Sequence, residues 1–153
     1  MNMVVENNGM YKHILVAVDF SENSQKALEK AQAMASQCHA DIELIHIVEI
    51  PVYPVLEDIA VMGMPGLWDE ELAQTLLETS NTKLQKLANQ FQITNFKVIE
   101  GIPSSDIVEY ASQKQHDLIV MGAHGVSGIK LLTGSTTNSV INHAKCDVLA
   151  VKL

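Results

Sequence analysis

The residues best suited to chemistry lie in one stretch, 121–137, which reads MGAHGVSGIKLLTGSTT and holds four of the eight glycines of the protein. Glycine lets backbone N–H groups approach a ligand closely and adopt positive φ angles. The hydroxyl cluster Ser135, Thr136 and Thr137 precedes a short apolar helical run, and the free N–H groups of a helix start favour an anion. The pattern therefore predicts a loop that holds the phosphates of a nucleotide.

Three better-known phosphate-site patterns do not fit this stretch. No lysine stands directly before the Ser/Thr cluster, as a P-loop requires, and Asp19-Phe20-Ser21 follows the first expected strand in place of G-x-G-x-x-G. Phospho-receiver domains resemble one another in an acidic pair after the first strand and an acceptor Asp after the third. Here a single Asp19 and Glu100 stand at those places. These features argue against all three classes.

Aliphatic runs alternate with helical patterns along the chain, which predicts a parallel α/β sheet with helices on both faces. In such sheets ligands bind beyond the carboxyl ends of the strands, where Asp19 and the glycine loop would meet if the first and fourth strands are neighbours. The expected strands are 13–18, 42–48, 95–100, 118–121 and 148–151. The expected helices are 22–38 capped by Ser21, 70–91 capped by Asp69, one opening at Pro103, and 137–144.

Length and charge narrow the class of protein. A chain of 153 residues suits one domain, and a net charge of −8 with a pI of about 5.1 argues against nucleic acid or anionic lipid as a partner. No apolar run is long enough to cross a bilayer and we see no secretion signal, so we expect a cytoplasmic protein. Cys38 and Cys146 form no metal or redox motif and are expected to be buried hydrophobes.

Two segments lack a clear pattern. Residues 1–10 are polar and predict a flexible tail, which leaves 11–153 as the single domain. Residues 50–68 are apolar and hold three of the four prolines. They predict a mobile insert, and the patterns leave open whether it is a lid, a binding loop or a partner surface.

Four segments together resemble the single-domain universal stress proteins: 11–21, 44–47, 117–122 and 147–151. The resemblance implies a Rossmann-like, adenine nucleotide alpha hydrolase-like fold with five parallel strands in the order 3-2-1-4-5. One branch of the family binds ATP through G-x-x-G, nine residues and G-[ST]; another branch lacks the glycines. This chain has Gly122-Ala-His-Gly125 and Gly134-Ser135 with eight residues between them, one fewer. Both ends of the loop are intact, so the chain resembles the ATP-binding branch.

The resemblance also implies which residues form the site. Positions near the first strand would lie under the adenosine, Ile47 would contact adenine, and the glycine loop and helix start would hold ribose and phosphates. Mg²⁺ or Mn²⁺ would accompany a triphosphate, held mainly by phosphate oxygens and water. The expected site residues are Ala17, Val18, Asp19, Ile47, Met121, Gly122, His124, Gly125, Gly134, Ser135, Thr136 and Thr137.

Plainer interpretations stand beside these. Asp19 could cap the turn after the first strand, and His46 fits a hydrogen-bonded core histidine. His124 fits a loop-closing bond or a phosphate contact, with a general base as a third option; Ser135 and Thr137 could be caps only. We expect no convergent partners for the remaining histidines, which are His13, His39, His116 and His143.

The function implied by the resemblance is a stress-response regulator that binds ATP or another adenine nucleotide and forms a homodimer through 148–151. One alternative is a dimeric interaction protein without nucleotide. Another is a slow ATPase, although the sequence gives little support for an efficient enzyme because it shows no general base with an orienting carboxylate.

Overall fold

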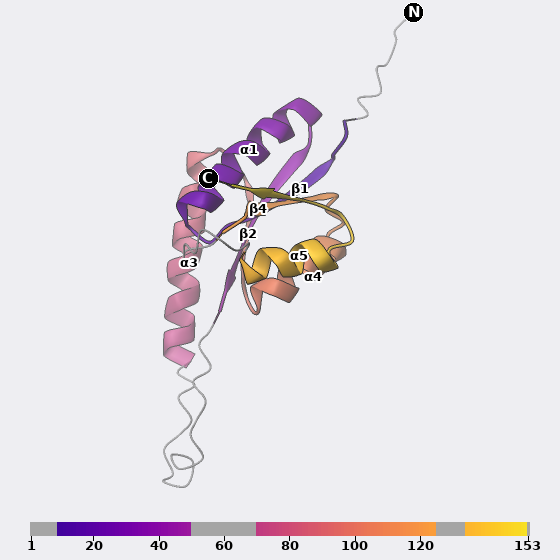
Figure 1. Ribbon diagram of the computed structural model, residues 1–153. Coiled ribbons are helices and arrows are strands. Elements are labelled where there is room, and N and C mark those ends of the chain that lie inside the picture. The colour runs from indigo at the N-terminus through magenta and orange to yellow at the C-terminus, as the bar shows by residue number, and fades with distance from the viewer. Residues whose placement is uncertain (1–8, 50–69, 125–133, 153) are drawn as a thin grey trace, which may run out of the picture.

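The computed structural model describes residues 9–49, 70–124 and 134–152 (Figure 1). Most of the predicted tail, the whole apolar insert 50–68, the predicted cap Asp69 and the loop residue Gly125 lie outside these ranges. The elements are β1 (His13–Ala17), α1 (Glu22–Cys38), β2 (Asp41–Val48), α3 (Glu70–Gln90), β3 (Asn95–Glu100), α4 (Pro103–Gln113), β4 (Leu118–Gly122), α5 (Ser135–His143) and β5 (Asp147–Val151).

The five strands form one parallel sheet in the order β3-β2-β1-β4-β5, which confirms the predicted sheet and strand order. β1 lies between β2 and β4, and Ala17 pairs with Ile45 on one side and with Met121 on the other. The first and fourth strands are therefore neighbours. The chain after Ala17 and the chain after Gly122 leave the sheet at the same edge.

Two helical layers cover the sheet, with α1 and α3 on one face and α4 and α5 on the other (Figure 1). Successive side chains of a strand point to opposite faces, so β1 contributes to both layers. Ile14 and Val16 pack with α1 and α3, whereas Leu15 and Ala17 pack with α4 and α5. Burial of β1 on both faces explains its unbroken aliphatic run.

Most predicted boundaries hold within a residue or two, and α1 begins and ends as predicted, with Ser21 Oγ accepting from the Ser24 N–H at 3.1 Å. The start of α5 was predicted two residues too late, because the hydroxyls that were read as preceding the helix occupy its first turn. Cys38 and Cys146 are free, but they are half-buried rather than fully buried. Within the described ranges, no helix combines the length and apolarity needed to span a membrane.

Candidate functional site

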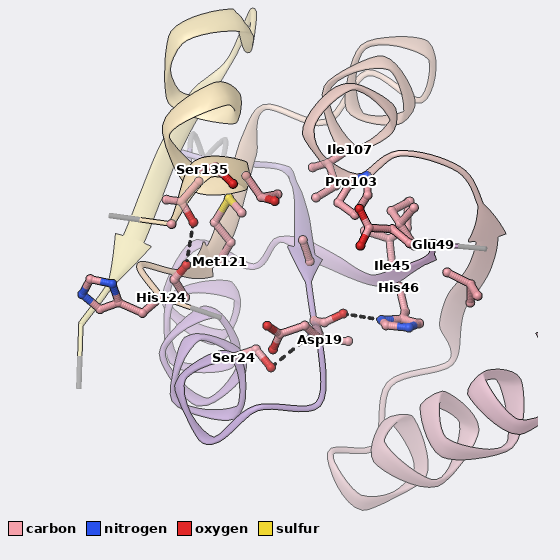
Figure 2. Close-up of a pocket in the computed structure, with 18 residues that line it drawn as sticks. Asp19, Ser24, Ile45, His46, Glu49, Pro103, Ile107, Met121, His124 and Ser135 are labelled. Atoms are coloured by element: carbon pink, nitrogen blue, oxygen red, sulfur yellow. Dashed lines mark hydrogen bonds between the residues drawn. The ribbon is translucent and has the colours of Figure 1, made fainter. Parts of the chain in front are cut away.

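A cavity of about 580 Å³ lies at the carboxyl ends of β1, β2 and β4, beside the amino ends of α4 and α5 (Figure 2). This volume is in the range of small-molecule sites. The lining includes each predicted site residue within the described ranges: Ala17, Val18, Asp19, Ile47, Met121, Gly122, His124, Gly134, Ser135, Thr136 and Thr137. The fold thus gathers residues from β1, β2, β4 and α5 and from the chain next to these elements, although their predicted contacts with a nucleotide stay predictions.

Asp19 sits in the turn between β1 and α1 and serves that turn directly. Its Oδ1 accepts hydrogen bonds from the Ser21 N–H at 3.0 Å and from the Ser21 hydroxyl, and its own N–H donates to Ser24 Oγ at 3.3 Å. Asp19 is half-buried and faces the cavity (Figure 2). One carboxylate oxygen is thus engaged in the turn, so the structural interpretation of Asp19 holds without excluding a ligand contact by Oδ2.

The residue after Asp19 adopts an unusual conformation. Phe20 has φ of 63°, in the left-handed region that a bulky residue rarely enters. Its ring centroid lies 4.5 Å from that of His46, and the Lys83 Nζ lies 5.7 Å from the Phe20 centroid on the α3 side. His46 Nδ1 lies 2.7 Å from the Val18 carbonyl oxygen, so His46 is a hydrogen-bonded, half-buried histidine, as one interpretation of the sequence held.

The chain that leaves β4 at the start of the glycine loop is in close contact with α1. Asn23 is buried, and its Nδ2 donates to the His124 carbonyl oxygen at 2.7 Å. The imidazole of His124 points away from the side of the cavity where Asp19 and His46 lie (Figure 2). His124 therefore meets the cavity at its loop end and not at the end where β1 and β2 stop.

Two hydrogen bonds join the chain before the loop 125–133 to the chain after it. The Gly134 N–H donates to the Ala123 carbonyl at 3.0 Å, and Thr137 Oγ1 donates to the Gly122 carbonyl at 2.9 Å. The Thr137 side chain therefore links α5 to β4 by a hydrogen bond, and the alternative in which it only caps the helix is wrong. The described ends of the loop are held together despite its shorter length.

The start of α5 has the features of an anion site. Gly134 is its N-cap and offers no side-chain acceptor. The first N–H groups of a helix lack helical partners and carry partial positive charge. Ser135 and Thr136 line the cavity at this point, so the backbone of the helix start and two hydroxyls face the same space. Because no side chain caps this helix, Ser135 is not the cap that one interpretation of the sequence allowed.

Charged groups and metal ligands are sparse in the described lining. Asp19 and Glu49 supply carboxylates, whereas the described lining contains no lysine or arginine. The described ranges contain no group of three or more His, Cys, Asp or Glu residues that could hold a metal ion. A divalent cation at this site would depend largely on the oxygens of the ligand and on water.

Sequence reasoning missed several lining residues: Ser24, Ile45, Val48, Glu49, Pro103 and Ile107, together with His46 as a wall of the cavity. A signal for some of them was present. The rule that ligands bind beyond the carboxyl ends of parallel strands points to Val48 and Glu49 as directly as to Asp19. The contributions of α1 and α4 depend on which helix covers which strand, and the hydrophobic pattern does not carry that information.

The expectation that His116 lacks a convergent partner was wrong. His116 Nε2 lies 3.0 Å from Glu43 Oε2, and the Tyr110 hydroxyl donates to Glu43 Oε1 at 2.5 Å. Burial lowers the pKa of His116, and the nearby charge of Glu43 opposes that shift. Burial raises the pKa of Tyr110, and the hydrogen bond to Glu43 adds to the increase. This cluster lies at the start of β2, far from the cavity at its carboxyl end, and belongs to the framework.

Comparisons with known proteins agree with this geometry. A sequence profile described as the universal stress protein family matches residues 10–152. Universal stress protein A homolog 2 from Coxiella burnetii is 37% identical, covering 94% of this chain and 96% of that protein. Universal stress protein UspA from Lactobacillus plantarum superposes with a TM-score of 0.75 at 27% identity, covering 92% and 97% of the two chains. A universal stress protein solved in complex with cAMP has a TM-score of 0.57 at 24% identity, covering 93% and 97%.

Proposed function

The chain belongs to the universal stress protein family, and on that premise we propose that its cavity binds an adenine nucleotide. The base and ribose lie against the ends of β1 and β2, with Asp19 beneath the ribose. The phosphates lie at the glycine loop and at the start of α5. In this proposal the protein acts in the stress response as a dimeric regulator in the cytoplasm, and nucleotide occupancy changes its dimer contacts or its choice of partner.

One observation carries the proposal: the strand ends and the uncapped start of α5 line the same cavity. A nucleotide needs an apolar wall for its base and N–H donors for its phosphates. Ile47 and Ile107 supply apolar surface, and the start of α5 supplies the donors. A volume of about 580 Å³ accommodates a ligand of this class. The cAMP complex of another family member adds that this fold can hold an adenine nucleotide in that protein.

The site favours binding over turnover. Phosphoryl transfer to water gains from a positioned base and from cations on the transferred group. The described lining has no lysine or arginine to place beside a transferred phosphate. A triphosphate would bring Mg²⁺ or Mn²⁺ with it. We therefore propose a binding protein, with hydrolysis as a slow side reaction at most.

The experiment begins with the freshly purified protein. Acid releases any bound small molecules for mass analysis, and the emptied protein is then titrated with ATP, AMP and cAMP by calorimetry. We expect an adenine nucleotide in the extract or a saturable titration. If the extract is empty and no titration occurs up to millimolar nucleotide, the proposal is wrong and the nucleotide-free dimeric interaction protein takes its place.

A matched pair of variants locates the site. Asp19→Asn keeps the acceptor that Ser21 uses and removes the charge, so the turn should survive. Loss of a charged hydrogen bond to the ligand should weaken binding about 10- to 100-fold. Asp147→Asn, at the opposite end of the sheet, removes an equal charge and should leave the affinity unchanged. An equal loss in both variants would point to net charge rather than to this site.

A further inference from the structure

The backbone hydrogen bonding between β1 and β2 stops one bond short of where the register of the two strands would allow it to continue. The Val18 N–H donates to the Ile45 carbonyl at 2.9 Å, as in a regular parallel pair. The next bond of that pattern would run from the Ile47 N–H to the Val18 carbonyl. The backbone hydrogen bonds between described residues include the first of these and not the second. The two strands thus form a fork at this point.

The imidazole of His46 takes the place of the missing ladder donor. Its Nδ1 lies 2.7 Å from the Val18 carbonyl oxygen (Figure 2). A carbonyl oxygen only accepts, so Nδ1 carries the proton and donates. The ring also packs against Phe20, the positive-φ residue of the turn between β1 and α1. His46 therefore satisfies Val18 and braces the turn that carries Asp19.

The fork leaves the peptide group of Ile47 facing the cavity. Backbone groups of alternate residues point to the same side of a strand, and the Ile45 carbonyl points toward β1. The N–H and C=O of Ile47 point in the same direction as the Ile45 carbonyl. β1 has already ended opposite Ile47. Ile47 lines the cavity. Contact between Ile47 and a base is the family-based expectation; the structure adds what holds this peptide open.

We propose that His46 is a positioning residue, which keeps the β1–β2 fork open so that the Ile47 peptide and Asp19 are presented to the base and ribose of the ligand. This inference rests on the proposed adenine-nucleotide function. His46 acts through Val18 and the turn, and no direct contact with the ligand is needed. A side chain that donates from the same place should replace it, and an apolar side chain of similar size should not.

The first test needs no ligand. Amide exchange in ¹⁵N-labelled protein is compared for the wild type, His46→Leu and His46→Asn, because the amide nitrogen of Asn can reach the place of Nδ1. In His46→Leu the Val18 carbonyl is free to accept from the Ile47 N–H. The Ile47 amide should then exchange at least about 10-fold more slowly than in the wild type. In His46→Asn it should exchange as in the wild type. Equal exchange in all three proteins would overturn the inference.

The second test measures the ligand. Adenosine affinity should fall about 10-fold or more in His46→Leu and return to within about threefold of the wild type in His46→Asn. Inorganic triphosphate probes the loop and helix start alone. Its affinity, measured by competition, should be the same in the wild type and in both His46 variants. Lys83→Ala is the matched control, since it removes the cation over Phe20 without touching Val18.

The two proposals fail in different ways. If wild-type protein binds no adenine compound, the proposed function is wrong, and the Ile47 exchange comparison still decides whether His46 holds the fork. If the wild type binds and His46→Leu binds equally well while folded, the function stands and the role of His46 is refuted. A folded His46→Asn that fails to restore affinity would also refute it.

Discussion

The Nδ2 atom of Asn23 lies 2.7 Å from the carbonyl oxygen of His124, so the first turn of α1 holds the chain where it leaves β4. Asn23 also lies close to Gly122, two residues before His124. A Cβ on Gly122 would lie 3.0 Å from Asn23 Nδ2 and 3.1 Å from the Asn23 backbone carbon. Glycine at 122 therefore serves the close packing of α1 on the end of β4. Phosphate approach alone does not explain it.

Gly122→Ala should lower the free energy of unfolding by about 1–3 kcal/mol, the range for overpacking in a close contact. The cost arises because the Asn23 backbone, unlike a flexible side chain, cannot move aside without shifting α1. Urea denaturation followed by circular dichroism measures it. A Gly122→Ala protein as stable as the wild type would mean that α1 adjusts freely, and would leave ligand approach as the reason for this glycine.

Asn23→Asp tests the hydrogen bond itself. The side chain keeps its shape but loses the donor, and a buried carboxylate then faces the His124 carbonyl. We expect a loss of about 1–3 kcal/mol in the free energy of unfolding, because a buried acceptor is left without its partner. Asn81→Asp on the exposed face of α3 introduces the same charge and should cost little. Equal stability of the two variants would show that Asn23 does not hold the loop.

Ser21→Ala removes a side chain with two roles. Ser21 Oγ accepts from the Ser24 N–H as the N-cap of α1 and donates to Asp19 Oδ1. Loss of an N-cap costs about 1 kcal/mol, and the freed Asp19 carboxylate should bind the ligand less tightly. Chemical denaturation and calorimetry report the two effects separately. Ser36→Ala, exposed in the last turn of α1, is the control, and a similar cost there would refute the capping role.

The fold could be predicted from sequence because each strand is an aliphatic run and each helix has a periodic face. Burial of β1 on two sides gives its continuous run, and Ser21 followed by an amphipathic segment marks the start of α1. The order of the strands did not come from these patterns. It came from the family resemblance, since hydrophobic periodicity leaves the neighbours of β1 open.

The site was predictable where the chemistry is local and was missed where it depends on packing. The spacing of glycines and hydroxyls at 122–137 is enough to predict an anion loop. The hydrogen bonds of Asn23 and His46 join segments that are 101 and 28 residues apart, respectively. Asn23 does not stand out in the sequence, because Asn at a helix start is common. His46 was expected to be a hydrogen-bonded core histidine, but neither its partner nor its place in the cavity wall was predicted. Only the arrangement of α1, β1 and β2 gives them roles.

β5 is an edge strand, and we expect it to pair with β5 of a second copy. The Val151 carbonyl accepts from the N–H of Ala123, the residue after β4, so the N–H of Ala150 points to the outer edge. Ala150→Pro removes that outer donor, which an edge strand tolerates. Light scattering should show a monomer with an unchanged circular dichroism spectrum. Val148→Thr leaves the backbone intact and should stay dimeric; a dimer in both would place the interface elsewhere.

The cluster of His116, Glu43 and Tyr110 should make stability depend on pH. Burial lowers the pKa of His116 below its ordinary value of 6.5, although the carboxylate of Glu43 works against this. The unfolded chain then takes up the proton first as the pH falls. The stability that neutral His116 contributes is therefore complete above about pH 6.5 and is lost as the pH falls toward its folded pKa, with a slope of at most about 1.4 kcal/mol per pH unit.

His116→Gln removes the titration and keeps a donor toward Glu43. Urea unfolding between pH 8 and 5.5 should give a flatter profile for this variant than for the wild type, whatever their difference at pH 8. This pH range lies above the ordinary pKa values of Asp and Glu side chains. His143→Gln is the matched control, because His143 is exposed at the end of α5 and should leave the wild-type slope intact. Parallel profiles for His116→Gln and the wild type would mean that His116 titrates equally in the folded and unfolded chains, and that its burial is offset by Glu43.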